Sequence, residues 1–108
     1  MKLAELAKIL NAKIVNLPDP DAEAESGYCG DFLSFVMQRA PEKSAWFTVM
    51  TNVNVAAVAS LTEVAVVVVC EGSKCDAALI DRVRTQNIAL FETDLDIFGA
   101  VKAYVNGR

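Results

Sequence analysis

The stretch Ala65-Val-Val-Val-Val-Cys70 decides which fold this sequence can adopt. Its β-branched side chains favour a strand, and no polar residue interrupts the run. A strand with one face in water alternates apolar and polar residues, whereas a parallel strand that helices cover on both faces is apolar throughout. We therefore expect residues 65–70 to form the central strand of a parallel sheet.

Helix and strand patterns alternate downstream of this strand. Asp76 precedes residues with helical spacing, and Ile88–Phe91 is typical of the next strand. Thr93 and Asp96 approximate a capping box, which predicts a last helix behind them. The inward apolar stripes expected on the two helices are Leu79, Ile80 and Val83 on the first, and Leu95, Phe98, Val101 and Val105 on the second.

The same alternation holds immediately upstream. Residues 45–50 predict a strand in which Trp46 and Phe47 serve packing, although one of these two neighbours must point outward, where it would mark a contact surface. Polar residues 51–54 suit the start of a helix, and Pro41 ends an earlier helix that Gly30 or Asp31 opens. The inward residues expected on these helices are Leu33, Val36, Met37 and Ala40 on the earlier one, and Val55, Val58, Ala59 and Leu61 on the later one.

The amino-terminal part adds an amphipathic helix at residues 2–10, a short strand at residues 13–16 and a strand near Tyr28. Short connections between alternating strands and helices imply right-handed crossovers and a parallel sheet. The sequence therefore predicts one domain over residues 1–108. Its class is α/β, a small three-layer domain with a mainly parallel sheet and helices on both faces.

Composition excludes several classes of function. The 10 basic and 14 acidic residues give a net charge of −4, which disfavours nucleic-acid binding. The longest apolar run is far shorter than the roughly 20 residues that cross a bilayer. Three cysteines with irregular spacing argue against a disulfide framework and favour a reducing, cytoplasmic location.

The chain contains no histidine, so it lacks the most common general base and the usual partner of a serine or cysteine nucleophile. It also lacks a P-loop, a dinucleotide-binding glycine fingerprint, a zinc-protease helix and a nucleophile elbow. We therefore expect no catalytic residues and a chain that is not an enzyme. No cofactor is implied.

Small polar residues gather where the predicted parallel strands end. Ligands of open parallel sheets bind at that edge, where loops and helix amino termini present backbone N–H groups. Such an edge can hold a phosphate or nucleotide through amides, hydroxyls and one lysine. The candidate ligand-binding residues are Gly27, Tyr28, Asp31, Thr51, Asn52, Asn54, Gly72, Ser73, Lys74 and Thr93.

A structural role is the alternative for many of these candidates. Asp31, Asn54 and Thr93, like Asp76, are residue types that cap helices, and the glycines serve turn geometry. Cys29, Cys70 and Cys75 form a metal site only if all three thiolates join, so we assign no metal ligand. Cys70, at the end of a strand, is best interpreted as a small buried hydrophobic residue.

Three stretches together resemble the DRTGG domain family. They are Gly27-Tyr-Cys-Gly-Asp-Phe-Leu-Ser-Phe-Val-Met37, Trp46-Phe-Thr-Val-Met-Thr-Asn-Val-Asn-Val-Ala-Ala-Val-Ala59 and Val66-Val-Val-Val-Cys-Glu-Gly72. The name-giving Asp-Arg-Thr-Gly-Gly string is absent. The loop where it is expected reads Cys70-Glu-Gly-Ser-Lys74, in which only Gly72 is retained.

The resemblance implies a fold related to the amino-terminal domain of HPr kinase and a free-standing domain that pairs as a homodimer. Family members accompany CBS domains in regulated pyrophosphatases, and free-standing ones of anaerobes are associated with iron-only hydrogenase systems. Two hypotheses follow. The chain is a regulatory module that binds an adenine nucleotide or another phosphorylated small molecule, or it is an accessory protein of a redox complex, with a partner protein and no small-molecule ligand.

Overall fold

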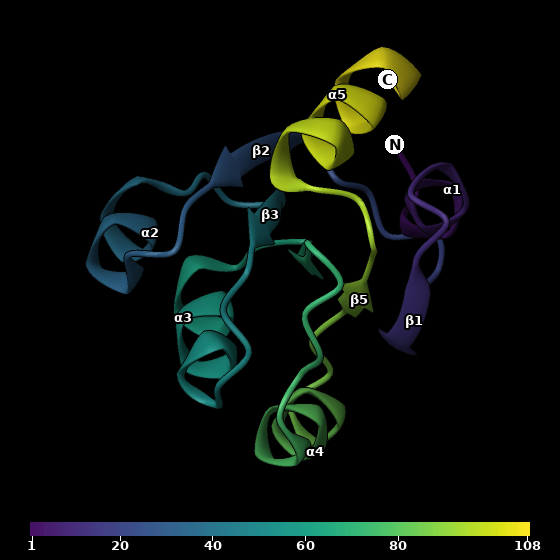
Figure 1. The fold of residues 1–108 in the computed structure, drawn as a ribbon. Helices are drawn as coiled ribbons and strands as arrows, with labels where there is room; N and C mark the ends of the chain where they lie inside the picture. Colours follow the sequence, from purple (N-terminus) through teal and green to yellow (C-terminus); the bar gives the residue numbers. More distant parts are fainter.

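The predicted parallel sheet is present, with β4 (Val66–Val69) at its centre. The strand order is β1-β5-β4-β3-β2, as the computed structural model of residues 1–108 shows (Figure 1). The other elements are α1 (Leu3–Ile9), β1 (Lys13–Asn16), β2 (Ser26–Cys29), α2 (Leu33–Arg39), β3 (Ser44–Thr48), α3 (Asn54–Thr62), α4 (Ala77–Thr85), β5 (Leu90–Glu92) and α5 (Ile97–Gly107).

Four of the strands are parallel and one is not. β2, β3, β4 and β5 pair in parallel, and β1 joins the sheet antiparallel to β5. Each parallel pair is connected through a helix, as right-handed crossovers require. The class predicted from the sequence, a mainly parallel α/β domain, is therefore confirmed.

Helices cover both faces of the sheet, so every residue of β3 and β4 is buried. α1 and α5 pack on one face, with Phe47 and Val68, while α2, α3 and α4 pack on the other, with Trp46 and Val67 (Figure 1). The expectation that Trp46 or Phe47 points outward was wrong. Successive side chains of a strand do alternate, but here neither face of the strand meets water.

Several expected inward positions are in fact exposed. Phe98 and Val105 of α5 and Leu95 of the loop before it are exposed, whereas Ala100 and Tyr104 of α5 are buried against the sheet. The same error affects the other face of the sheet, where Met37 and Leu61 are exposed. Ala100 and Tyr104 therefore take the inner side of α5 in place of the expected stripe.

The predicted helix caps also differ from the observed ones. Asp96 caps α5 without Thr93, and its Oδ1 accepts a hydrogen bond from the backbone N–H of Gly99. Phe32, and not Gly30 or Asp31, occupies the N-cap position of α2, and Asp76 occupies that of α4 without a side-chain bond.

The five helices are short, with 11 residues in the longest, and none combines the length and hydropathy that crossing a bilayer requires.

Leu79 and Leu61 give a test of the packing, because the two leucines have the same size and opposite exposure. Leu79 of α4 is fully buried against the sheet, and Leu61 of α3 is 72% exposed. Replacing Leu79 with alanine should lower the free energy of unfolding by about 2–5 kcal/mol, since it removes packed methyl groups and leaves a cavity. Leu61→Ala should change it by less than about 0.5 kcal/mol. Urea denaturation of both variants measures the difference, and equal losses would contradict this packing.

Candidate functional site

The carboxyl ends of β2, β3, β4 and β5 meet at one edge of the sheet, which we call the rim. Four segments form it: residues 30–32, 49–53, 70–76 and 93–96, each leading from a strand to the next helix. In Figure 1 this edge faces the viewer. Seven of the ten predicted ligand-binding residues lie in these segments, Asn54 opens α3 directly after one of them, and Gly27 and Tyr28 lie on β2.

Asp31 ties the first rim segment to the second. Its Oδ1 accepts hydrogen bonds from the Thr48 hydroxyl at 2.7 Å and from the Val49 backbone N–H at 2.9 Å. The hydroxyl of Thr48 in turn accepts a bond from the Met50 N–H at 3.2 Å. The Asp31 carboxylate therefore fixes the loop after β3, and this geometry explains why it does not cap α2.

The segment after β4 is bonded to the segment after β5. Glu71 and Gly72 both adopt positive φ angles, 65° and 70°. This turn lets the Glu71 N–H donate to Leu95 O at 2.8 Å and the Gly72 N–H donate to Thr93 O at 3.1 Å. Gly72 thus has the turn role that left-handed backbone geometry gives to glycine.

The second segment contacts the start of α4. The carbonyl of Thr51 accepts a hydrogen bond from the Asp76 N–H at 3.0 Å. The side chain of Asn52 accepts one from the Asn54 N–H at 2.9 Å, a local turn that opens α3. All four rim segments are thus cross-bonded through backbone groups and short polar side chains.

The side chains of Ser73 and Lys74 form no hydrogen bond or ion pair within the chain, and the same holds for those of Thr51 and Asn54. Ser73 and Lys74 lie directly before the amino terminus of α4, whose N-cap residue Asp76 makes no side-chain capping bond. Lys74 is exposed. The hydroxyl of Ser73 and the ammonium of Lys74, the one cation among the predicted residues, are therefore available to a ligand.

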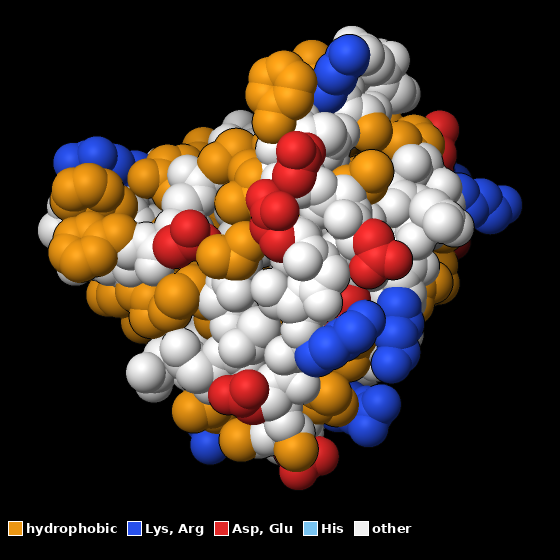
Figure 2. Space-filling view, viewed as in Figure 1, with side chains coloured by type: hydrophobic (Ala, Val, Ile, Leu, Met, Phe, Trp, Pro, Cys, Tyr) orange, Lys and Arg blue, Asp and Glu red, His pale blue; other side chains and the backbone are white.

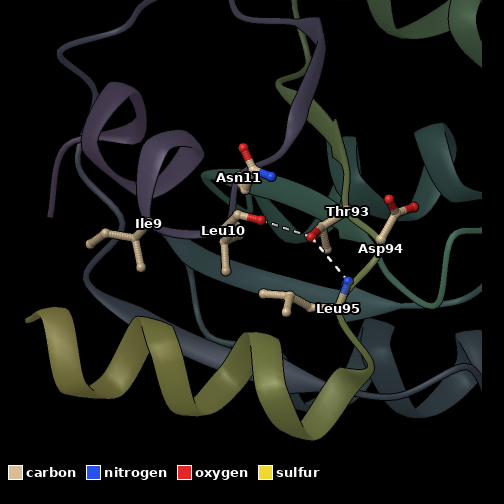
Figure 3. A pocket seen from close by; sticks show the side chains of 6 residues that line it. All are labelled: Ile9, Leu10, Asn11, Thr93, Asp94 and Leu95. Carbon is tan, nitrogen blue, oxygen red and sulfur yellow. Dashed lines mark hydrogen bonds between the residues drawn. The ribbon is translucent and has the colours of Figure 1, made fainter.

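A cavity of about 240 Å³ opens beside the rim, between the end of α1 and the loop after β5. Figure 3 shows its two sides: Ile9, Leu10 and Leu95 point toward α5, and the polar side chains of Asn11 and Asp94 lie on the other side. The turn after α1 was not predicted to contribute. The only sequence feature that could have pointed to this turn is Asn11, which ends the first helical pattern. In the structure, Asn11 adopts a positive φ of 47°.

Thr93 is buried and engaged within the chain. Its hydroxyl donates to Leu10 O at 2.9 Å and accepts from the Leu95 N–H at 3.3 Å, as the dashed lines in Figure 3 show. It therefore shapes the cavity wall and does not pair with Asp96 in a capping box. Gly27 and Tyr28 lie elsewhere, on β2, where they line a groove beneath α5.

Carboxylates outnumber basic groups at the rim. Glu71 Oε2 accepts from the Ile97 N–H at 3.3 Å and Asp96 Oδ1 accepts from the Gly99 N–H, so two carboxylates already occupy the amino terminus of α5. Figure 2 shows acidic side chains gathered directly below α5. The amino terminus of α4, beside Lys74, is the part of the rim better suited to an anion.

Glu92, the last residue of β5 and next to the rim, is the one buried carboxylate of the chain. Its Oε2 accepts a hydrogen bond from the Cys75 N–H at 2.8 Å, and its Oε1 has no partner. Lys13 lies directly opposite on β1 in the strand register. Glu92 therefore holds the end of the 70–76 segment against β5.

The three thiols have raised pKa values. Burial raises the pKa of Cys70 to about 12, with a further contribution from Glu71, and burial together with Glu92 raises that of Cys75 to about 12. Burial also raises the pKa of Cys29. Cys70 is buried in the core, as predicted. Thiols that keep their proton at neutral pH are weak nucleophiles, and no three cysteine, aspartate or glutamate side chains are arranged to hold a metal ion.

Comparison with known proteins identifies the fold. No protein-family model and no curated protein matches the sequence. Among solved structures, the CBS and DRTGG domains of the regulatory region of Clostridium perfringens pyrophosphatase, in complex with the activator diadenosine tetraphosphate, match with a TM-score of 0.77. The match covers 94% of this chain and 45% of that one at 16% identity. The chain thus spans less than half of that regulatory region, and the expected DRTGG-like fold is confirmed.

The thiols make stability depend on pH in a predictable direction. The folded state holds the Cys70 and Cys75 protons up to about pH 12, whereas the unfolded state releases them near the ordinary pKa of 9.0. The contribution of these two protonated thiols to the free energy of unfolding is therefore fully present below pH 9. It is lost as the pH rises toward 12. Urea midpoints of the wild type should fall between pH 9 and 11 more steeply than those of Cys70→Ala/Cys75→Ala. Parallel pH profiles for the two proteins would contradict the raised pKa values.

Proposed function

We propose that this domain is a non-catalytic regulatory module that binds an adenine nucleotide or another phosphorylated small molecule at the rim. The observation that carries the proposal is the pair of unengaged side chains, Ser73 and Lys74, at the open amino terminus of α4. Every neighbouring loop is held in place by internal bonds, so a ligand meets a preformed edge. The similarity in fold to a nucleotide-activated regulatory region supports the same role.

The two ends of a nucleotide would occupy different parts of the rim. Lys74 and Ser73 offer a cation and a hydroxyl to the phosphates. The cavity next to them offers Asn11 and Asp94, whose amide and carboxylate groups suit the base and the ribose hydroxyls. These parts are adjacent because Gly72, which directly precedes Ser73, is hydrogen-bonded to Thr93.

The excess of carboxylates limits the phosphate charge that the rim tolerates. Glu71 and Asp96 bind the amino terminus of α5, with Asp94 nearby in sequence, and Lys74 is the only cation of the four rim segments. The negative charges of a polyphosphate would be repelled by these carboxylates. We therefore infer that a divalent cation accompanies a polyphosphate ligand, and that the domain works as a cytoplasmic homodimer that transmits occupancy of the rim to a partner.

Calorimetric titration with AMP, ADP, ATP and diadenosine tetraphosphate, with and without Mg²⁺, tests the proposal. A bound nucleotide should also raise the melting temperature, by an amount equivalent to about 2.7 kcal/mol at a ligand concentration 100 times Kd. Lys74→Ala should weaken binding roughly tenfold to a hundredfold, because it removes a charge-assisted hydrogen bond.

Arg84→Ala is the matched control, since Arg84 is an exposed cation at the far end of the same helix. It should leave affinity unchanged. Absence of both heat and thermal shift at millimolar nucleotide would exclude this function, and equal losses in the two variants would exclude Lys74 as the phosphate ligand.

A further inference from the structure

A groove of about 350 Å³ lies between β2 and α5, and it shares no lining residue with the cavity beside the rim. α5 packs mainly over β3, so the face of the edge strand β2 beside it stays open (Figure 1). Cys29 is paired with Phe47, which faces α5, and side chains two residues apart share a face of a strand. Gly27 and Cys29 therefore form the floor of the groove, and both are exposed.

The wall of the groove is apolar and held in place by one hydrogen bond. The Tyr104 hydroxyl donates to the Ser26 carbonyl at 2.8 Å, which fixes α5 relative to β2. The rings of Tyr104 and Phe47 are in contact, with 5.7 Å between their centroids. Val101 and Val105, one turn apart on α5, complete the wall. The groove is thus preformed, and its volume lies within the range of small-molecule sites.

Arg108 is the one charged side chain that lines the groove. Its guanidinium lies over the Tyr104 ring at 5.4 Å and donates to the Glu25 carbonyl at 2.7 Å. The carboxylate of Glu25 is paired with Lys43 at 3.2 Å, so it does not neutralise Arg108. α5 itself carries Lys102 and no carboxylate. In a chain with a net charge of −4, this groove is an apolar surface with a positive end.

We propose that the groove binds a small organic carboxylate with an apolar body, such as an aryl- or alkyl-substituted carboxylic acid. The body lies between the floor and Val105, where its apolar surface leaves water. The carboxylate accepts the N–H groups of Arg108 that the Glu25 carbonyl does not use, since a guanidinium carries several donors in a planar fork.

The chemistry of the groove separates it from the rim. A nucleotide brings several phosphate charges, and here they would meet one cation and an apolar floor, where unpaired charge is costly. A monocarboxylate needs one cation only. The groove is therefore a second ligand site, and it stands whether or not a nucleotide binds at the rim.

Amide NMR spectra of the protein titrated with phenylbutyrate test this site, with phenylbutyramide as the neutral analogue of the same shape. Phenylbutyrate should shift the signals of Gly27, Cys29 and Val105 and leave those of residues 70–76 in place. It should bind about twofold to fivefold more tightly than the amide, because an ion pair with the exposed Arg108 is weakened by water.

Three variants separate the contributions of charge and shape. Arg108→Gln removes the cation, so the two probes should then bind equally well. Lys102→Gln is the matched control, because Lys102 is an exposed cation of the same helix that does not line the groove, and it should keep the wild-type preference. Cys29→Phe fills the floor and should weaken both probes alike. Since Cys29 is exposed, this variant should keep the circular dichroism of the wild type.

Four results would each overturn the assignment. They are the absence of shifts at Gly27 and Cys29 with millimolar probe, equal affinity of the wild type for the two probes, a preference that survives Arg108→Gln, and undiminished binding to a folded Cys29→Phe protein. Titration of the same sample with ATP is read from residues 70–76, so failure of the groove site and failure of the rim site are observed separately.

Discussion

The burial of β4 on both faces is the constraint on which the rest of the structure depends. Four consecutive valines in one strand expose apolar surface above and below the sheet, and only two helix layers can cover both. Once those layers exist, each parallel strand needs a crossover helix. All carboxyl ends then meet at one edge, so the position of the rim follows from the hydrophobicity of four residues.

The order of elements was predictable because strands and helices in this chain differ in composition as well as in period. Val66–Val69 is β-branched and uninterrupted, and Pro41 ends a helical pattern. The orientation of α5 was not predictable. Phe98, Val101 and Val105 form a regular apolar stripe, and periodicity alone cannot distinguish a stripe that faces the core from one that faces outward. Ala100 and Tyr104 occupy the inner side because Tyr104 reaches the Ser26 carbonyl.

The candidate site was predictable at the level of loops and not of single side chains. Topology places Ser73, Lys74 and Asp31 at one edge, since their loops follow parallel strands. Whether a polar side chain is free depends on contacts that are distant in sequence. The Thr93 hydroxyl donates a hydrogen bond to the carbonyl of Leu10, which directly follows α1. Asp31 bonds to the end of β3, so neither residue has the capping role that its type suggests.

The irregular pairing of β1 has a consequence for assembly beyond the single domain. A sheet that could be extended from both sides would add subunits without limit and form fibres. Because a register irregularity and Lys13 block the β1 side, this sheet cannot be extended from both sides. An unlimited stack of sheets is therefore closed to this valine-rich domain.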